Sequence, residues 1–218
     1  MATISIGNSQ FNLVEGTQYN DLGTLWGTQN KDFIVGHGGA DRLQGLGGDD
    51  ILFGDDVFLG NSMTLLTAGS DYLEGGLGND ILWGGPGSDS LFGDDTQSKT
   101  GGNDILIGSD AVLSTNLPQT DYLAGGSGSD TFVLGGSTWG VSYQYYGSSD
   151  YALILDWDYK SDKIGVTGSL DRYSLRTGNW HGQSNLLDTG IFYNNELIAI
   201  ISDSTNVNIG RDFLVNVV

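Results

Sequence analysis

The sequence contains no cysteine, only 2 prolines among its 218 residues, and no long apolar run. Without cysteine the chain has no disulfide, no thiol nucleophile and no thiolate metal site. A transmembrane helix needs about 20 consecutive apolar residues, so the sequence predicts no membrane span. The first residues, Met1 to Ile6, also lack the charged and apolar regions of a Sec-type signal peptide.

Positive charge and glutamate are scarce as well. The chain has 8 Lys and Arg against 27 Asp and Glu, and its formal net charge is −19. This balance argues against nucleic acid and anionic membranes as partners, and it favours cations. Only Glu15, Glu74 and Glu196 are glutamates, and the other acidic residues are Asp. Because Asp has a short carboxylate and tolerates turn conformations, this preference suggests ligands positioned in loops.

Glycine is abundant, with 36 residues, and it follows a nine-residue repeat. The segments "GGLGNDILW" and "GGPGSDSLF", which begin at Gly75 and Gly84, show the pattern: Gly in the first, second and fourth positions, Asp in the sixth, and a large apolar residue in the eighth. Similar units begin at Gly27, Gly36, Gly45 and Gly125. Units with insertions before their Asp begin at Gly54, Gly93 and Gly108.

The eighth position is apolar in every unit. Its residues are Ile34, Leu43, Leu52, Leu73, Leu82, Leu91, Leu106, Leu123 and Phe132. A three-residue segment with its central side chain inward is a minimal strand, and the glycine-rich residues form the turn. Two units, of 18 residues, complete one coil. The sequence therefore predicts an all-β fold: a parallel β-roll, that is, a two-sheet β-solenoid whose apolar ladders meet between the sheets.

The aspartates of stacked coils are expected to form columns. Coils lie about 4.8 Å apart, so one column contains Asp41, Asp71, Asp89 and Asp121, and the other contains Asp32, Asp50, Asp80, Asp104 and Asp130. Like charges at about 5 Å repel by roughly 1–3 kcal/mol per pair. We expect cations between the coils, and calcium fits best because it accepts several oxygen ligands in flexible geometry, including backbone carbonyls.

The nonapeptide pattern resembles the RTX (repeats-in-toxin, hemolysin-type) repeat, a calcium-binding parallel β-structure. The resemblance covers roughly Gly27 to Val133. It implies a calcium-loaded β-roll, export by a type I secretion system, and folding triggered by extracellular calcium. We expect about four to seven bound Ca²⁺ ions.

The metal ligands implied by the resemblance are the sixth-position aspartates and the fourth-position glycines. They are Asp41, Asp50, Asp71, Asp80, Asp89, Asp104, Asp130, Gly39, Gly48, Gly69, Gly78, Gly87, Gly102 and Gly128. Asp32 and Asp121 depart from the pattern, because Asn30 and Gln119 replace the glycine. Further candidates beside the insertions are Asp55, Asp56, Asp94 and Asp95.

Two readings without metal stay open. Gly- and Asp-rich repeats also form flexible linkers, but a linker has no use for an apolar ladder. A metal-free β-solenoid keeps the ladder but leaves the aspartate columns unexplained.

One sheet also has an apolar outer face, in pairs such as Ile51 with Phe53 and Ile81 with Trp83. That face is covered by other parts of the chain or is a docking face for self-association or another partner.

The chain is expected to divide into an N-terminal cap (1–26), the roll (27–133) with inserted loops near 55–68, 94–100 and 109–118, and a C-terminal β cap (134–218). The segment "DYALILDWDYKSDKIGV" resembles the one that follows the repeats in serralysins and alginate-epimerase repeat modules. The segment "GIFYNNELIAII" predicts an antiparallel hairpin with its turn at Asn194 and Asn195. The ending "RDFLVNVV" resembles an uncleaved type I secretion signal and also reads as a final strand.

No catalytic motif is present. The sequence lacks H-E-x-x-H and G-x-S-x-G, and its aspartates belong to a periodic series, so we expect no enzyme. The favoured function is a secreted calcium-binding protein with a structural or surface-associated role. The alternative is a calcium-dependent polysaccharide-binding or adhesion module. Aromatic candidates for stacking on a sugar are Trp139, Tyr143, Tyr145, Tyr146 and Trp180.

Overall fold

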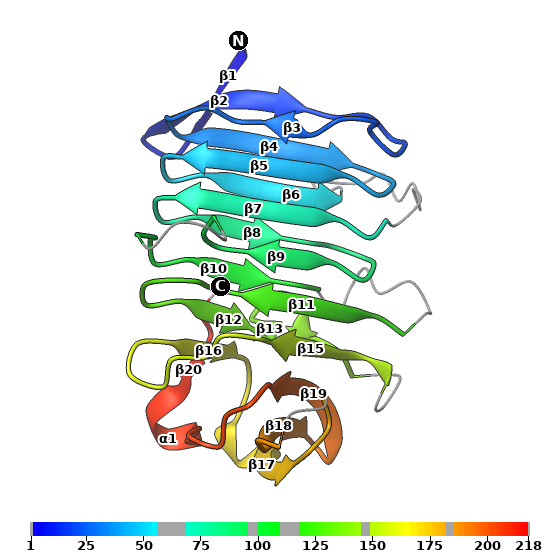
Figure 1. Cartoon of the computed structure of the whole chain (residues 1–218), viewed down its shortest axis with the longest axis vertical. Helices are drawn as coiled ribbons and strands as arrows, with labels where there is room; N and C mark the ends of the chain where they lie inside the picture. The colour runs from blue at the N-terminus through cyan, green and yellow to red at the C-terminus, as the bar shows by residue number, and fades with distance from the viewer. Residues whose placement is uncertain are drawn as a thin grey trace.

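The computed structural model describes residues 2–55, 69–95, 100–109, 118–144, 149–181 and 185–217. Within these residues the chain forms two nine-stranded sheets and one two-stranded sheet. Figure 1 shows the strands stacked like rungs from the N-terminus downward, with the helix α1 and strands β17 to β19 at the other end. The all-β roll predicted from the repeat is confirmed.

Both large sheets are parallel over the repeats, since each strand pairs with the strand one coil away. The first sheet contains, in spatial order, β1 (Ala2–Ile6), β2 (Ser9–Glu15), β4 (Asp32–His37), β6 (Ile51–Asp55), β8 (Ile81–Trp83), β10 (Ile105–Ile107), β12 (Thr131–Val133), β16 (Lys163–Val166) and β20 (Phe213–Val215). The second sheet contains β17 (Tyr173–Gly178), β18 (Asp188–Tyr193), β19 (Glu196–Ile201), β15 (Tyr151–Ile154), β11 (Thr120–Ala124), β9 (Ser90–Phe92), β7 (Tyr72–Leu77), β5 (Arg42–Gly47) and β3 (Leu25–Trp26).

The core lies between the two sheets and is built around the eighth-position side chains, with Ile154 and Ile164 continuing it beyond the repeats. Strand register aligns these residues into two ladders whose members are 0% exposed. The first-sheet ladder is Ile34, Leu52, Leu82, Leu106, Phe132 and Ile164. The second-sheet ladder is Leu43, Leu73, Leu91, Leu123 and Ile154. Each such side chain contributes roughly 1.5–3 kcal/mol when fully buried, and only a neighbouring coil can bury it.

The fourth-position glycines allow the turns to stack. Gly78 has φ +125°, and a Cβ there would overlap the carbonyl oxygen of Gly48 in the preceding coil. Gly128, with φ +143°, meets the carbonyl oxygen of Gly102 in the same way. Left-handed backbone and close approach both require glycine, so the periodic glycine sets the spacing of the coils.

Both ends of the roll are extended by non-repeat strands. The hairpin β1–β2 joins the first coil, because β2 pairs in parallel with β4. At the other end β15 and β16 continue the two sheets, and β19 and β20 follow them. The predicted final strand is β20, which follows the short helix α1 (Ile209–Asp212).

The C-terminal antiparallel region is built on the predicted hairpin. Strands β18 and β19 are joined through Asn194 and Asn195, whose φ values are +50° and +72°, and β17 pairs with β18 after the 3₁₀ helix η2 (Leu170–Arg172). These left-handed residues are what a tight hairpin turn needs. None of the helices among the described residues is long and apolar enough to cross a membrane.

The apolar outer face of the first sheet is partly covered by the chain itself. Val133 and Ile107 are 0% and 2% exposed, whereas Ile81 is half-buried. A hairpin of β13 (Gly135–Gly136) and β14 (Gly140–Val141) carries Trp139 onto this face. The result is an aromatic row whose successive ring centroids are 5.5, 5.8 and 5.0 Å apart. Its members are Phe33, Phe53, Trp83 and Trp139.

Candidate metal centres

Sixth-position aspartates form two columns, each along one edge of the roll. The first column is Asp32, Asp50, Asp80, Asp104, Asp130 and Asp162. The second column is Asp21, Asp41, Asp71, Asp89 and Asp121. The columns predicted from the nine-residue spacing are confirmed. Asp21 and Asp162 were not predicted, although Asp21 ends the degenerate unit "GTQYND" and is recognisable there.

In every aspartate after the first of each column, one carboxylate oxygen accepts a hydrogen bond from the neighbouring aspartate of the column. The backbone N–H of Asp32 donates to Oδ1 of Asp50 over 2.8 Å, and the N–H of Asp50 donates to Oδ1 of Asp80 over 2.7 Å. The same bond joins every neighbouring pair in both columns, at 2.7 to 3.1 Å. The carboxylates therefore satisfy the turn amides of the coil before them, which stabilises the stack.

The other carboxylate oxygen has no such use in the middle of the columns. Within the two columns, six buried Oδ2 atoms have no hydrogen-bond partner among the described residues. They belong to Asp41, Asp50, Asp71, Asp80, Asp89 and Asp104. A buried carboxylate oxygen without a partner is costly, so these atoms indicate a missing positive charge.

The electrostatics agree with that interpretation. Burial raises the pKa of Asp50 and of Asp104 to about 8, although an N–H donor lowers it in each case. Burial likewise raises the pKa of Asp71 and of Asp80 to about 7. A carboxylate held in this way gains more from a nearby cation than one exposed to water, because burial disfavours its charged form.

The unpartnered oxygens converge with backbone carbonyls of the next coil. A Cβ built on Gly45 would meet Oδ2 of Asp50 and, at 2.5 Å, the carbonyl oxygen of Gly75. The same arrangement recurs at Gly75, which faces Oδ2 of Asp80 and, at 2.6 Å, the carbonyl oxygen of Gly93. First-position glycines in the middle of the roll thus leave space for oxygens from two coils. Oxygen-only donors of this kind suit calcium.

The cation would take much of its coordination from the backbone. No group of three or more His, Cys, Asp or Glu side chains that could hold a metal occurs among the described residues. Carboxylate oxygens spaced one coil apart, alternating with carbonyls, fit the flexible oxygen shell of calcium better than the compact octahedron of magnesium.

The remaining predicted ligands have other surroundings. Oδ2 of Asp94 accepts from the N–H of Ser127 at 2.6 Å, Asp55 is buried, and Asp95 is exposed. Asp56 lies outside the described residues. Asp130 accepts the N–H of Asp104, and burial raises its pKa to about 7. The fourth-position glycines stack on the preceding coil, as described for Gly78 above, and this packing sets the turn geometry.

The aromatic residues predicted for sugar stacking are not brought together as one platform. Tyr143 is only 3% exposed, so its ring has no free face and the prediction is wrong for this residue. Trp139 packs on Trp83 in the aromatic row, and Trp180 is 40% exposed beside Phe192. Tyr145 and Tyr146 lie outside the described residues.

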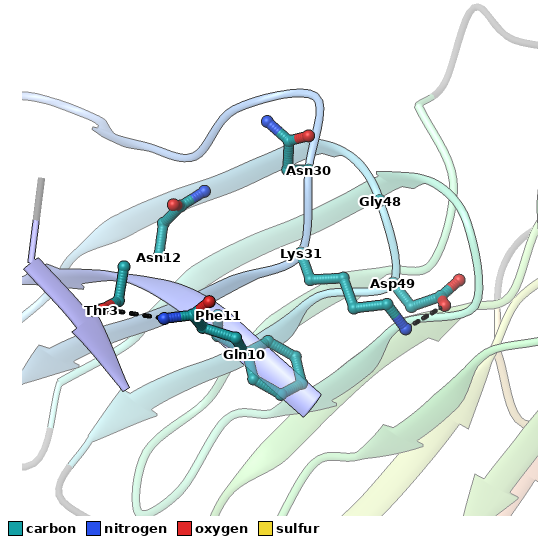
Figure 2. Close-up of a pocket in the computed structure, with 8 residues that line it drawn as sticks. All are labelled: Thr3, Gln10, Phe11, Asn12, Asn30, Lys31, Gly48 and Asp49. Carbon is teal, nitrogen blue, oxygen red and sulfur yellow. Dashed lines mark hydrogen bonds and ion pairs between the residues drawn. The ribbon is translucent and has the colours of Figure 1, made fainter. Parts of the chain in front are cut away.

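An open hollow lies at the N-terminal end of the first column (Figure 2). It is lined by Thr3, Gln10, Phe11, Asn12, Asn30, Lys31, Gly48 and Asp49. Across it, Nζ of Lys31 pairs with Oδ2 of Asp49 at 2.6 Å, and this hydrogen bond lowers the pKa of Asp49. Here, unlike in the middle of the columns, the chain supplies its own cation.

Comparison with known proteins gives one family match. The family model described as RTX calcium-binding nonapeptide repeat (4 copies) matches residues 26–58, 67–96 and 119–137. No curated protein matches the chain. Among solved structures the chain is similar to the solution structure of the AlgE6R3 subunit from the Azotobacter vinelandii mannuronan C5-epimerase. The sequence identity is 19%, the match covers 92% of this chain and 83% of that chain, and the TM-score is 0.24.

Proposed function

Since the chain is an RTX calcium-binding repeat protein, we propose that calcium ions bound between successive coils drive the folding of its β-roll outside the cell. Its role would be structural or surface-associated rather than catalytic. The proposal rests on one observation, the six buried Oδ2 atoms in the middle of the two columns. Each faces carbonyl oxygens of a neighbouring turn, and each lacks a compensating positive charge.

Residues of two consecutive coils would hold each ion. Oδ2 of Asp80 and the carbonyl oxygen of Gly93, which converge at Gly75, are a representative pair. Bound calcium supplies the charge that makes the ionised columns stable, and the Oδ1 ladder fixes the carboxylates in place to receive it. Because the unfolded chain has no such convergence, the free energy of binding contributes to folding.

Export and folding would be coupled through the calcium concentration. Extracellular calcium-binding modules bind at about 10⁻⁴ to 10⁻³ M, far above the concentrations that buffer proteins work at inside cells. The resemblance of "RDFLVNVV" to a type I secretion signal supports this proposal. An acidic chain that stays unfolded until it meets external calcium suits such a route.

Far-UV circular dichroism tests the proposal. The chelated protein is expected to lose most of its β signal and to regain it when calcium is added, whereas magnesium at the same concentration is expected to restore less. Calorimetric titration should then find several ions per chain. Full β structure and unchanged thermal stability after exhaustive removal of metal would contradict the proposal.

A second function is favoured by the aromatic row on the first sheet. Aromatic faces are suited to stacking on sugar rings, and Trp83 and Trp139 remain only partly buried. We expect a calcium-dependent polysaccharide-binding or adhesion module to show binding on a glycan array with calcium and none with chelator. A matched Trp83→Ala variant should lose that binding, whereas Trp180→Ala should keep it. If the wild-type protein binds no glycan on the array, the second function is excluded and only the structural role remains.

Self-association through the same face is tested with Ile81, which is half-buried in it. Light scattering of an Ile81→Asp variant with calcium should show loss of any oligomer while circular dichroism stays unchanged. Loss of the fold instead would mean that the face is covered within the chain.

A further inference from the structure

The aspartates at the ends of the two columns differ from those in the middle. In Asp32 both carboxylate oxygens have protein donors: Oδ1 accepts from Nδ2 of Asn12 at 2.8 Å, and Oδ2 accepts from the N–H and the hydroxyl of Thr28 at 2.6 and 2.9 Å. Asn12 belongs to β2, and Figure 2 shows it beside the loop that carries Asn30 and Lys31. Asp32 therefore needs no further charge to satisfy its hydrogen bonds.

In the units without insertions, the second residue accounts for this difference. In complete units it is a glycine with positive φ, +109° at Gly76 and +103° at Gly85, and its N–H donates to a carbonyl of the next coil, at Gly93 and Gly108 respectively. The N–H is thereby turned away from the aspartate of its own unit. His37 and Leu46 adopt the same left-handed backbone, and the aspartates of their units, Asp41 and Asp50, have unpartnered Oδ2 atoms.

Threonine at the second position gives the opposite result. A β-branched residue strongly resists positive φ, and neither Thr17 nor Thr28 adopts it. The N–H of Thr17 donates to Oδ2 of Asp21 at 3.0 Å, and its hydroxyl donates to Oδ1 at 3.0 Å. The N-terminal members of both columns are therefore closed by a threonine four residues before the aspartate.

The C-terminal ends are closed by different donors. Oδ2 of Asp121 accepts from the buried hydroxyl of Tyr143 at 2.6 Å. At Gly108 this hydroxyl stands where the carbonyl of the next coil stands in the middle coils, because a Cβ on Gly108 would meet Oη of Tyr143 and Oδ2 of Asp121. In the other column, Oδ2 of Asp162 accepts from the N–H of Asp158 at 2.8 Å.

We propose that these donors, which we call stoppers, take the place of calcium at the terminal aspartates and so confine the ions to the middle of each column. The stoppers belong to Thr17, Thr28, Tyr143 and Asp158. This inference rests on the proposed calcium binding and adds where the binding ends and which residues end it. Thr28 and Tyr143 carry it most directly, since each places a hydroxyl on an Oδ2 atom that is unpartnered elsewhere in the columns.

Counting bound ions in full-length variants tests the inference. Tyr143→Phe removes one hydroxyl and leaves Asp121 with an unpartnered Oδ2, so native mass spectrometry at saturating calcium is expected to find one more ion than in the wild type. The matched control is Tyr173→Phe, because Tyr173 is also buried and its hydroxyl donates to the carbonyl of Thr167 at 2.8 Å, away from both columns. The control should keep the wild-type ion number.

A second pair of variants tests the other end. Thr28→Gly restores the glycine of the complete repeat and should add one ion at Asp32, whereas Thr28→Ser keeps the hydroxyl and should add none. The stopper inference is overturned if both Tyr143→Phe and Thr28→Gly bind the wild-type number of ions. It is supported if either gains an ion that its control does not. A wild-type protein that binds no calcium would instead overturn the proposed function itself.

Discussion

Buried aspartates occur both in the roll and in the C-terminal region, and their surroundings are opposite. Asp80 and Asp104 in the roll are fully buried, each has one oxygen without a partner, and burial raises their pKa to about 7 and about 8. Asp188 and Asp212 in the C-terminal region are also fully buried, yet their pKa is lowered. All four side chains are closed to solvent, but those of the roll lie deeper in the protein and keep one oxygen without a hydrogen bond, whereas those of the C-terminal region have their charge compensated by nearby donors.

The difference lies in the donors that the chain provides. Burial alone would raise the pKa of Asp188, but the N–H groups of Asp203, His181 and Trp180 outweigh it, at 2.8 to 2.9 Å. Asp212 is likewise buried, and Arg211 pairs with it at 2.6 Å. The C-terminal region carries its own compensation, whereas the middle of the roll lacks one among the described residues and, on the proposed function, takes a cation from solution.

Removing calcium should separate the two regions, and this is the largest effect that we expect. Hydrogen exchange of the chelated protein should show loss of amide protection in β6, β8 and β10, while β18 and β19 keep more of theirs. Carboxylates in the roll would repel one another without ions, but those of the antiparallel region would not. Uniform loss of protection in all of these strands would contradict the comparison.

Substituting one aspartate from each region should give two different defects. Asp80→Asn removes a ligand charge, so native mass spectrometry should find at least one calcium ion fewer per chain. Asp188→Asn should leave the ion number unchanged and lower the free energy of unfolding in urea by about 1–3 kcal/mol, because three backbone donors lose a charged acceptor. Both are measured at saturating calcium.

The matched control is Asp171→Asn, since Asp171 is exposed and lies outside the columns. It should change neither the ion number nor the urea midpoint. A loss of ions in Asp188→Asn would mean that the C-terminal region also depends on calcium, and the contrast between the regions would then be wrong.

The roll's side of this contrast could be predicted from the sequence, because a fixed repeat length determines which residues of neighbouring coils lie side by side. A nine-residue unit places Leu52 next to Ile34 and Leu82, and it places Asp50 next to Asp32 and Asp80, as the strand register and the hydrogen bonds have it. The pairing needs no knowledge of side-chain conformation. The fold and the two columns followed from that spacing alone.

The use of each carboxylate oxygen could not be predicted in the same way. Spacing gives the distance between Cα atoms, but the choice between Oδ1 and Oδ2 depends on rotamers and on the φ of the second residue. Thr17 and Thr28 did carry a signal, since each stands four residues before its Asp in place of a glycine. Tyr143 carried none, because the hairpin β13–β14 and not any repeat brings it to Asp121.

The smallest expected effect is the pH dependence of the calcium-free protein. Its sign follows from the pKa values of about 7 to 8 for Asp50, Asp71, Asp80 and Asp104, against an ordinary value of 3.8. Between pH 4 and 8, approximately, the folded roll binds more protons than the unfolded chain, so its stability falls as the pH rises. Lowering the pH from 8 to 5 should therefore restore part of the β signal of chelated protein, because protons then replace the missing cations.

With calcium the dependence of stability on pH should reverse, since calcium ions compete with protons for the same oxygens and bind more tightly as the pH rises. Asp188 and Asp212 add no slope in this window, because their lowered pKa values place their loss of stability below it. Circular dichroism across the range, with and without calcium, measures both slopes, and a calcium-free roll that gains structure towards pH 8 would show that burial of the columns is not what calcium compensates.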